Sequence, residues 1–419
     1  MQDLLFLSHR VPYPPDKGEK IRAWHIFRHL ARTHRMHLGC FIDDPADWEH
    51  LPVVRALCAD VACFPLNRRV AMLKSLLRLR RGEPLSLGYF HDSRLQRWAR
   101  AKLANPAIER VFVFSSAMAP YVMNAGVARQ GAQTRVLDFV DVDSAKWTAY
   151  GATAKLPMRA VWAREGRTLL AFERQAAACF DHSLFVSEHE WQCFVTLAPE
   201  TVGRTGWVDN GVDLGHFSPA KDLPPPFDHG GADVVFTGRM DYRPNIDAAQ
   251  WFARAVMPLL RAGRPEARFW IVGAAPAREV NELAALPGVH VTGRVPDTRP
   301  YLAYADVVVA PLRIARGIQN KVLEAMAMAR PVIATPEAFE GVRAMPGRDI
   351  LLADGAADML QRINEVLDGR HPTLGIAARQ AVEAGHQWSV TLRPLDRWFG
   401  EAVSEPEPGP RVVRSGYPI

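Results

Sequence analysis

A group of polar residues lies where an apolar strand is expected to end and a helix to begin, in Gly317–Ala327. The flanking stretches Val307–Pro311 and Val332–Thr335 have the continuous apolar character of buried strands. A helix N-terminus presents unpaired N–H groups and partial positive charge, to which Lys321 adds a formal charge. Glu324 follows about one turn later on the same side of the helix. This arrangement predicts a site for a phosphate and a diol, the two parts of a nucleotide.

A second cationic segment follows Val234–Thr237, another expected strand. Gly238 would let the backbone approach a ligand closely, and the guanidinium of Arg239 offers a fork that matches a diphosphate. Arg243 stands four residues further on and adds charge. The alternative for Arg239 is a surface cation at the end of a strand.

Three acids, Asp138, Asp141 and Asp143, follow one another at the end of an expected strand. In an extended segment, side chains spaced by two share a face, so we expect the three carboxylates to lie together. Close carboxylates repel, which raises at least one pKa and suits a proton acceptor. We take Asp141 as the first candidate for a general base and Asp143 as the second; the alternative is that they cap the next helix.

The loop Pro12–Lys20 follows the first expected strand. Gly18 would let the backbone approach a ligand, and Lys17 or Lys20 could meet negative charge. Ligands of doubly wound sheets bind at the carboxyl ends of strands, where this loop belongs. The alternative is a proline-stiffened surface turn.

The elements that must position these residues alternate along the chain. Residues 19–32 carry apolar side chains at helical spacing. Short apolar stretches separated by helical ones indicate strands at 4–8, 36–42, 111–114, 136–139, 183–186, 234–237, 269–272, 289–292, 307–311 and 332–335. Strands that alternate with helices predict an α/β fold with parallel sheets covered on both faces.

The stretch Gln319–Ala327 resembles the donor-site signature of GT-B glycosyltransferases of the family-4 type, and in detail a bacterial subgroup linked to exopolysaccharide and exosortase systems. The resemblance implies donor contacts from Arg316, Gly317, Gln319, Asn320, Lys321 and Glu324. The signature usually has a first Glu where this chain has Arg316, a residue that usually contacts the donor sugar. Segments Trp207–Pro219 and Gly238–Asn245 are similar to the family's domain junction and its phosphate-binding segment.

Two further positions depart from the family pattern. Asn245 stands where the family usually has a phosphate-binding Lys, and Ser115 and Ser116 stand where many members have a His. Lys321 and Arg243 would replace the lost charge at the first position. The second departure leaves the stereochemical outcome of a transfer open.

The resemblance implies two Rossmann-like, doubly wound domains that face a central cleft. We expect an acceptor-side domain at 1–208, a nucleotide-sugar-binding domain at 209–386, a helix at 387–403 that returns to the first domain, and a disordered tail at 404–419. With 419 residues the chain is long enough for two such cores.

Composition excludes several other classes. No apolar run approaches the roughly 20 residues that span a bilayer, and the five cysteines lack a Cys-x-x-Cys pair, as in a reduced cytosol. Val272–Ala275 lacks a full Gly-x-Gly-x-x-Gly, which argues against a dehydrogenase. His9, His91 and His189 show no metal-ligand spacing, so we expect no metal or cofactor beyond a nucleotide-sugar substrate.

A basic segment, 68–81, contains six cations and no acid. As a helix it would place Lys74, Arg78 and Arg81 on one stripe, with Leu73, Leu76 and Leu77 opposite. This pattern favours contact with an anionic membrane surface. The alternative is a solvated helix whose apolar side packs on the protein; nucleic acid is a weaker partner, because no binding motif accompanies the charges.

Together these features predict a cytoplasmic, membrane-peripheral glycosyltransferase that moves a sugar from a nucleotide donor to a surface polysaccharide or its lipid-linked precursor. Two rivals stay open. One is a nucleotide-sugar epimerase of the same fold, and the other is a non-catalytic scaffold of a polysaccharide assembly complex, which would fit the missing Glu at 316.

Overall fold

A computed structural model describes residues 1–15, 18–77, 82–129, 133–219, 222–228, 232–315 and 317–399. The side chains of residues 77 and 153 are also outside the description. Arg316, Lys17, residues 78–81 of the basic segment and the tail at 404–419 therefore lie outside the described residues.

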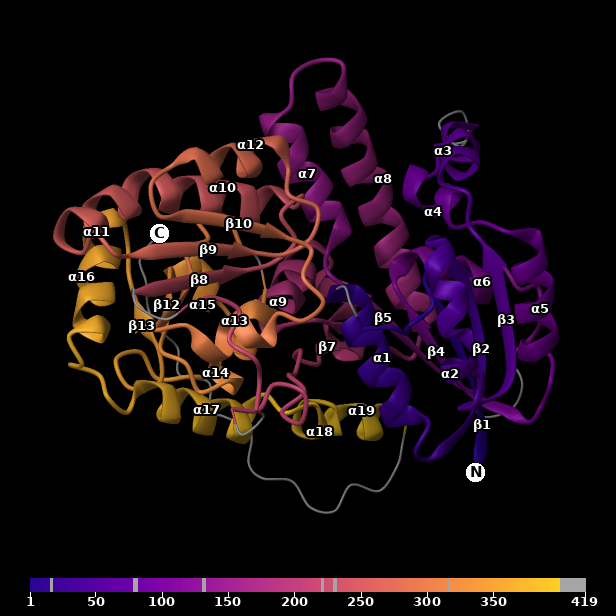
Figure 1. Ribbon diagram of the computed structural model, residues 1–419. Coiled ribbons are helices and arrows are strands. Elements are labelled where there is room, and N and C mark those ends of the chain that lie inside the picture. Colours follow the sequence, from indigo (N-terminus) through magenta and orange to yellow (C-terminus); the bar gives the residue numbers. More distant parts are fainter. Residues whose placement is uncertain are drawn as a thin grey trace.

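The chain forms two parallel sheets, each covered by helices on both faces (Figure 1). The N-terminal sheet has the order β3-β2-β1-β4-β5-β6-β7 and the C-terminal sheet the order β10-β9-β8-β11-β12-β13. The strands of the first sheet are β1 (Gln2–Ser8), β2 (His34–Ile42), β3 (Cys58–Pro65), β4 (Ile108–Phe114), β5 (Thr134–Val140), β6 (His182–Phe185) and β7 (Thr205–Trp207). Those of the second are β8 (Asp233–Thr237), β9 (Arg268–Val272), β10 (Val289–Gly293), β11 (Val307–Ala310), β12 (Val332–Ala334) and β13 (Leu351–Leu352).

The α-helices described in the N-terminal half are given next in chain order. They are α1 (Gly18–Leu30), α2 (Leu51–Arg55), α3 (Arg68–Leu77), α4 (Leu85–Tyr89), α5 (Ser93–Leu103), α6 (Pro120–Met123), α7 (Asp143–Thr153), α8 (Met158–Cys179) and α9 (Glu188–Leu197). Those that follow are α10 (Arg243–Trp251), α11 (Met257–Gly263), α12 (Arg278–Asn281), α13 (Arg299–Tyr304), α14 (Asn320–Ala327), α15 (Pro336–Phe339), α16 (Ala356–Leu367), α17 (Leu374–Gly385), α18 (Trp388–Thr391) and α19 (Arg393–Trp398).

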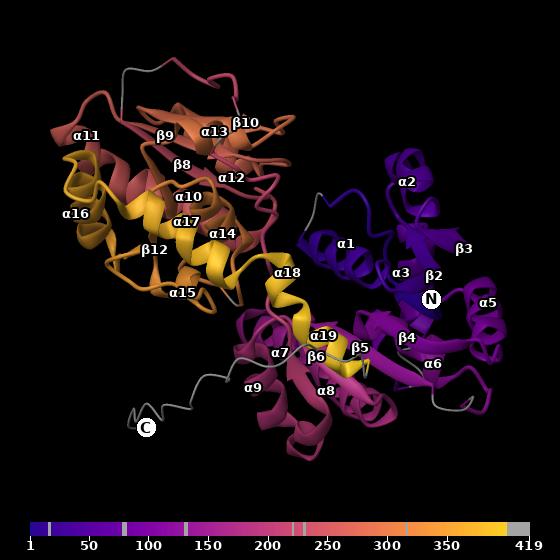
Figure 2. The ribbon, with the colours of Figure 1, turned by 90° about the horizontal axis from the view of Figure 1, so that it is seen from below.

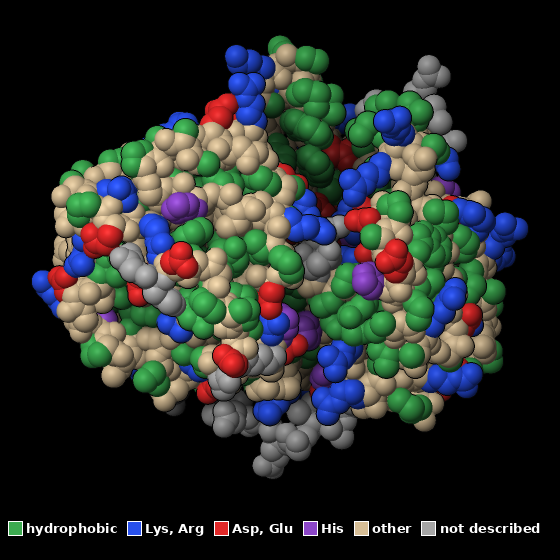
Figure 3. Space-filling model, in the orientation of Figure 1, with side chains coloured by type: hydrophobic (Ala, Val, Ile, Leu, Met, Phe, Trp, Pro, Cys, Tyr) green, Lys and Arg blue, Asp and Glu red, His purple; other side chains and the backbone are tan. Residues whose placement is uncertain are grey.

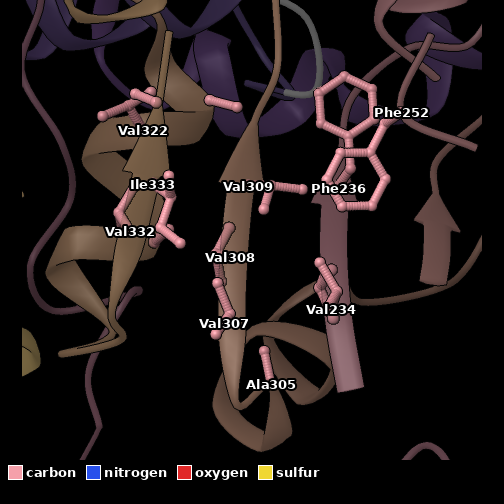
Figure 4. Packing of buried hydrophobic residues seen from close by; sticks show 14 of the residues in the cluster. Val234, Phe236, Phe252, Ala305, Val307, Val308, Val309, Val322, Val332 and Ile333 are labelled. Carbon is pink, nitrogen blue, oxygen red and sulfur yellow. The ribbon is translucent and has the colours of Figure 1, made fainter. Parts of the chain in front are cut away.

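Burial explains why the strands read as continuous apolar runs. Strands β8 and β11 are buried along their whole length, because helices cover both faces of the sheet. Figure 4 shows the result: Phe236 of β8 packs beside Phe252, while Val309 and Val322 fill neighbouring space. The fold class predicted from the sequence is therefore confirmed.

The chain crosses back to the N-terminal half through two short helices instead of the single helix that we predicted (Figure 2). Leu392 separates α18 from α19, and Pro394 is the second residue of α19, in the first turn, where its missing N–H is tolerated. His25 of α1 stacks on Trp388 with ring centroids 4.5 Å apart, and His29 Nε2 lies 2.6 Å from Asp396 Oδ1. These contacts attach the C-terminal segment to the first domain.

Candidate active site

The two sheets place their loops at switch points of the strand order. In the C-terminal sheet the order reverses between β8 and β11, so the loops that follow these two strands part there and leave a crevice. In the N-terminal sheet the same reversal lies between β1 and β4. The residues predicted to bind a nucleotide follow β8 and β11, which is where a doubly wound sheet binds its ligand.

The loop after β8 is held close to the loop after β9. Gly238 has φ +155° and Gly273 has φ +153°, and a Cβ built on Gly273 would stand 1.7 Å from the carbonyl oxygen of Gly238. Asn245, which is buried, donates from Nδ2 to the carbonyl oxygen of Arg239 at 2.7 Å. In this chain Asn245 therefore fixes the path of the Gly238–Arg239 backbone.

The first turn of α14 supplies a cation beside this loop. A Cβ on Gly238 would lie 3.3 Å from Lys321 Cε, so the lysine side chain runs along the glycine. Lys321 Nζ donates to Gln319 Oε1 at 3.2 Å, and Gln319 Nε2 donates to the carbonyl oxygen of Gly317 at 3.0 Å. Gly317 has φ +63°, a conformation that favours glycine. The turn before α14 is thus ordered around Lys321.

Burial shifts the pKa of both charged residues of α14. It lowers the pKa of Lys321 to about 8, an effect that the nearby Glu324 carboxylate opposes. It raises the pKa of Glu324 to about 7, which Lys321 opposes in turn. Burial disfavours both charged forms, so an anion beside Lys321 and hydroxyl donors beside Glu324 would each stabilise them.

The two arginines predicted for this site differ in their surroundings. Arg239 forms a two-pronged ion pair with Asp241, with Nε 3.1 Å from Oδ1, and about half of each side chain is exposed. Arg243 is exposed at the first position of α10. To bind a diphosphate, Arg239 would have to exchange its partner Asp241 for another anion.

Asp138 is not part of the site, contrary to our expectation that three carboxylates would share a face. It stands three residues before Asp141, and Val140 between them has φ +70°, which turns the chain. Asp138 is fully buried and accepts from Arg22 Nε at 2.9 Å. Arg22 also donates to the carbonyl oxygen of Val208 at 2.6 Å and to Asn210 Oδ1 at 3.1 Å. The pair joins β5 to the segment that leaves the first domain.

Asp141 and Asp143 lie at the start of α7 among other carboxylates. Desolvation by the surrounding protein, followed by repulsion from Glu190 and Asp143, raises the pKa of Asp141 to about 7. Because the residue is still exposed, solvent screens part of this effect. Burial also raises the pKa of Asp143, whose Oδ1 lies 3.8 Å from Lys146 Nζ. Asp141 is thus a group that exchanges a proton near neutral pH.

Two buried glutamates that the sequence analysis missed support this segment. Glu190 accepts from the backbone N–H of Val142 at 2.7 Å, and Glu173 accepts from the N–H of Ser144 at 3.1 Å. Burial raises the pKa of Glu173 to about 8. The signal for Glu190 was present, because Ser187 and Glu190 have capping-box spacing, yet the carboxylate reaches across to Val142. Glu173 carries no such signal.

The acids of the first domain face the donor loops of the second. Burial lowers the pKa of Lys146, but Asp143 and Asp141 raise it more strongly. Tyr242, which directly precedes α10, also interacts electrostatically with Lys146 and raises its pKa. A Cβ on Gly317 would stand 3.7 Å from Val186 Cγ1, just beyond β6. Asn210 Nδ2 lies 3.4 Å from Asn320 Oδ1. The structure therefore brings the two predicted groups of residues to one interdomain region.

The N-terminal loop is only partly as predicted. Gly18 is exposed at the first position of α1, and a Cβ added to it would meet no atom within 4 Å, so a ligand has room there. Lys20, by contrast, is buried and its Nζ lies 2.8 Å from Asp47 Oδ1. The prediction that Lys20 meets ligand charge is wrong, because a buried carboxylate already compensates it.

Ser115 and Ser116 mark the end of β4, where relatives often carry a His. Ser115 has φ +80°, and its Oγ accepts from the N–H of Ala117 at 3.4 Å. This serine begins a short helical turn and provides no base. The nearby His9 is buried and stacks on Phe114 with ring centroids 5.9 Å apart, and burial lowers its pKa to about 4.

His91 and His189 each have a protein partner in the described part of the chain. His91 stacks on Tyr121 at 6.5 Å, and His189 Nδ1 lies 3.2 Å from Glu340 Oε1 of the second domain. Among the described residues, no group of three or more His, Cys, Asp or Glu side chains gathers as a metal site. None of the helices in the described ranges is long and apolar enough to cross a membrane.

Residues 68–77 of the basic segment form α3, and most of the apolar side chains described there face outward. Ala71 and Ser75 are its buried residues, whereas Leu73 is 66% exposed and Met72 63% exposed. Leu76 is exposed as well. The alternative in which Leu73 and Leu76 pack on the protein is therefore wrong.

Comparison with known proteins agrees with this architecture. Residues 231–369 match the family model described as glycosyl transferases group 1. A search of curated proteins finds no match. Among solved structures, HepE from Anabaena in complex with UDP superposes with a TM-score of 0.64 at 15% identity, over 95% of this chain and 99% of that one.

Two further structures extend the likeness. Sucrose-phosphate synthase from Thermosynechococcus elongatus has a TM-score of 0.66 and 18% identity, covering 95% of this chain and 98% of its own. WaaG, a glycosyltransferase involved in lipopolysaccharide biosynthesis, has a TM-score of 0.62 and 14% identity, covering 95% and 100%. The fold is that of GT-B glycosyltransferases, and the family match over the second domain supports a transferase.

Proposed function

We propose that this protein transfers a hexosyl group from a nucleotide-sugar donor to a saccharide acceptor of a surface polysaccharide or its lipid-linked precursor. One observation carries the proposal. Lys321, the N-terminus of α14 and the closely packed Gly238 loop converge at the switch point of the C-terminal sheet. The structures of HepE with UDP and with UDP-glucose support a nucleotide-sugar ligand for this fold.

In the proposed complex the diphosphate lies against Lys321 and the first amides of α14, with Arg239 turning from Asp241 toward it. Glu324 accepts from the two ribose hydroxyls. These contacts neutralise the charge that develops on the leaving nucleoside diphosphate. In this proposal no metal ion or other cofactor takes part. We also assign Gly18, Gln319 and Asn320 to donor contacts, and Arg243, which is exposed, to additional positive charge.

The proposed reaction is a displacement at the anomeric carbon. The acceptor oxygen forms a bond to that carbon while the bond from carbon to the phosphate oxygen breaks, and the hydroxyl proton passes to Asp141. A carboxylate whose pKa is near 7 is suited to this transfer, and Asp143 tunes it. Should the departing phosphate take the proton instead, Asp141 would have no catalytic role while Arg239 and Lys321 would keep theirs.

We further place the protein in the exopolysaccharide- and exosortase-associated subgroup, at the cytoplasmic face of the membrane. The sequence Gln319–Ala327 supports the subgroup, and the outward apolar side chains of α3 support membrane contact. WaaG, of the same fold, is described as a glycosyltransferase involved in lipopolysaccharide biosynthesis.

The test is incubation of the purified protein with a panel of nucleotide sugars and lipid-linked saccharides. We expect release of nucleoside diphosphate together with an acceptor heavier by one hexose, detected by mass spectrometry. An epimerised nucleotide sugar formed without acceptor would establish the epimerase instead. Failure to bind any nucleotide sugar would favour the scaffold.

A further inference from the structure

The tip of the α7–α8 hairpin carries apolar and basic side chains that point away from the protein. We define the hairpin tip as Tyr150–Arg159. Leu156 is 78% exposed there, and Met158 and Tyr150 are each about two-fifths exposed. Lys155 and Arg159 are exposed beside them. The sequence has no acid between Asp143 and Glu165, so the tip has one sign of charge.

The hairpin is built to hold this tip in place. Trp147 of α7 stacks on Trp162 of α8, with ring centroids 4.7 Å apart and planes 16° from parallel. Trp147 also meets the edge of Tyr150 at 5.8 Å. Tryptophan and tyrosine near an exposed apolar tip are typical of a membrane–water interface, where one end of the ring is apolar and the other wet.

A second exposed apolar surface lies on α3, and contacts tie it to the hairpin. We define the α3 surface as Val70, Met72, Leu73 and Leu76. Helix α3 packs on α4, whose first turn is bound by the buried Glu165 of α8. Glu165 accepts from the backbone N–H groups of Leu85 and Ser86 at 2.9 and 3.0 Å. The hairpin tip and the α3 surface therefore keep a defined relation to each other.

Both project from the same end of the molecule, at the top of Figure 1. The space-filling view in Figure 3 shows a deep hollow between them, with apolar walls and acidic side chains visible inside. Helix α7 leads from the hairpin tip down to Asp143, and its 11 residues span about 16 Å. The hollow between the two surfaces thus opens toward the proposed catalytic acids.

We propose that the hairpin tip and the α3 surface together dock on a bilayer that contains anionic lipid, so that the mouth of the hollow faces the membrane. This inference deepens the proposed function and rests on it for the nature of the acceptor. A lipid-linked saccharide anchored in that bilayer would reach up between the two surfaces to Asp141. Its saccharide part must extend about 16 Å from the lipid headgroups, the length of α7.

Charge complementarity favours an anionic bilayer as the partner of the hairpin tip and the α3 surface. Apolar side chains that insert among lipids combine with Arg69, Lys74, Lys155 and Arg159, whose cations suit anionic headgroups. Two separate contacts also fit the physics of peripheral binding, in which a single weak anchor gives reversible attachment and two give a stable one.

The experiment is flotation of the full chain with vesicles of phosphatidylcholine containing about one third phosphatidylglycerol, compared with phosphatidylcholine alone. We expect binding to the anionic vesicles, and a fall of about tenfold or more in the partition coefficient for Leu156→Ser combined with Met158→Ser. Lys155→Glu combined with Arg159→Glu should lower binding similarly, and added salt should weaken the wild type.

Matched controls are Leu259→Ser and Ile376→Ser, which remove equally exposed apolar side chains on α11 and α17 of the other domain. They should bind vesicles as the wild type does. Wild-type-like flotation of the Leu156/Met158 variant would overturn the proposal. So would a concentration-dependent dimer, seen by sedimentation, that this variant abolishes, because the tip would then bind a second copy.

Nucleotide binding separates this proposal from the proposed function. The Leu156/Met158 variant should retain the wild-type affinity for nucleoside diphosphate, since the tip is about 16 Å from the start of α7. Vesicle binding without nucleotide binding would refute the transferase and leave the docking surface intact. Nucleotide binding without vesicle binding would refute the docking surface alone.

Discussion

Lys321 lies directly against Gly238: a Cβ on the glycine would stand 3.3 Å from Lys321 Cε. The contact joins the loop after β8 to the first turn of α14, the two elements that flank the switch point of the C-terminal sheet. Because Gly238 has no side chain, the lysine lies along the backbone toward the place where a diphosphate would bind. A larger residue at this position would meet Asn245 Nδ2 first, at 2.7 Å, and would also crowd the lysine.

Glu324→Gln should weaken nucleotide binding by about 1–1.5 kcal/mol, the difference between a charge-assisted hydrogen bond and a neutral one. The fold should be unaffected, because burial already disfavours the Glu324 carboxylate, as its raised pKa of about 7 indicates. Calorimetric titration measures the affinity, and Glu337→Gln, an exposed residue of α15, is the control. An affinity equal to that of the wild type would remove Glu324 from the ribose site.

Asp141→Asn should abolish transfer while nucleotide affinity stays within a factor of about two, since a general base contributes to the chemical step and acts on the acceptor. In the wild type, kcat/KM should rise with pH through about 7, because only the ionised carboxylate accepts a proton and the pKa of Asp141 is about 7. Asp143→Asn should be milder. Turnover near the wild-type rate in Asp141→Asn would remove Asp141 as the base, and either another group or the leaving phosphate would take the proton.

Asp138→Asn should behave differently from Asp141→Asn although the two residues are only three positions apart, because Asp138 lies in β5 and Asp141 follows it. It leaves the Arg22 guanidinium buried without a full counter-charge, at a cost of about 3–5 kcal/mol in the free energy of unfolding. Urea unfolding followed by tryptophan fluorescence measures this, with Asp141→Asn as the stable control. Equal stability of the two variants would contradict a structural role for the Arg22–Asp138 pair.

Gly273→Ala should disrupt the proposed donor site indirectly, by displacing the loop after β8. The new Cβ would meet the carbonyl oxygen of Gly238 at 1.7 Å, so the loop after β8 must move, and φ of +153° adds strain. We expect a lower midpoint of thermal unfolding and weaker nucleotide binding. Gly263→Ala, which meets no atom within 4 Å, should leave both unchanged. Normal binding by Gly273→Ala would mean that the two loops are not as closely packed as the structure has them.

The alternation of strands and helices could be predicted well from the sequence, because buried parallel strands such as β8 and β11 are short, continuous apolar runs. Prediction was less successful for partly exposed or very short strands. Strand β3 is only partly buried along its length, and β13 has two residues, so neither has a clear periodic signal. That the candidate donor segments follow β8 and β11 could be predicted, since local motifs mark both loops, whereas their contact with a donor stays a prediction.

The contacts that escaped prediction join residues distant in sequence. Arg22 and Asp138 are 116 positions apart, and nothing local shows that Asp138 turns into the core at Val140 while Asp141 stays in the hollow. Lys20 and Asp47 form a similar buried pair. The hairpin tip was missed for another reason: whether Leu156 faces solvent or the core depends on how α7 and α8 pack.

The most direct test of the nucleotide site is calorimetric titration of UDP, GDP and ADP into the wild type and Lys321→Met. We expect at least one nucleotide to bind, with a loss of about 1.5–3 kcal/mol in the variant. The pKa of Lys321 is about 8 in the free protein, so the lysine is already charged below that pH and binding takes up no proton there. Above about pH 8 the neutral lysine must regain its proton beside the diphosphate, so affinity should fall and proton uptake should appear in buffers of different ionisation enthalpy. Binding of none of the three, or equal binding by Lys321→Met at every pH, would contradict a nucleotide site at Lys321.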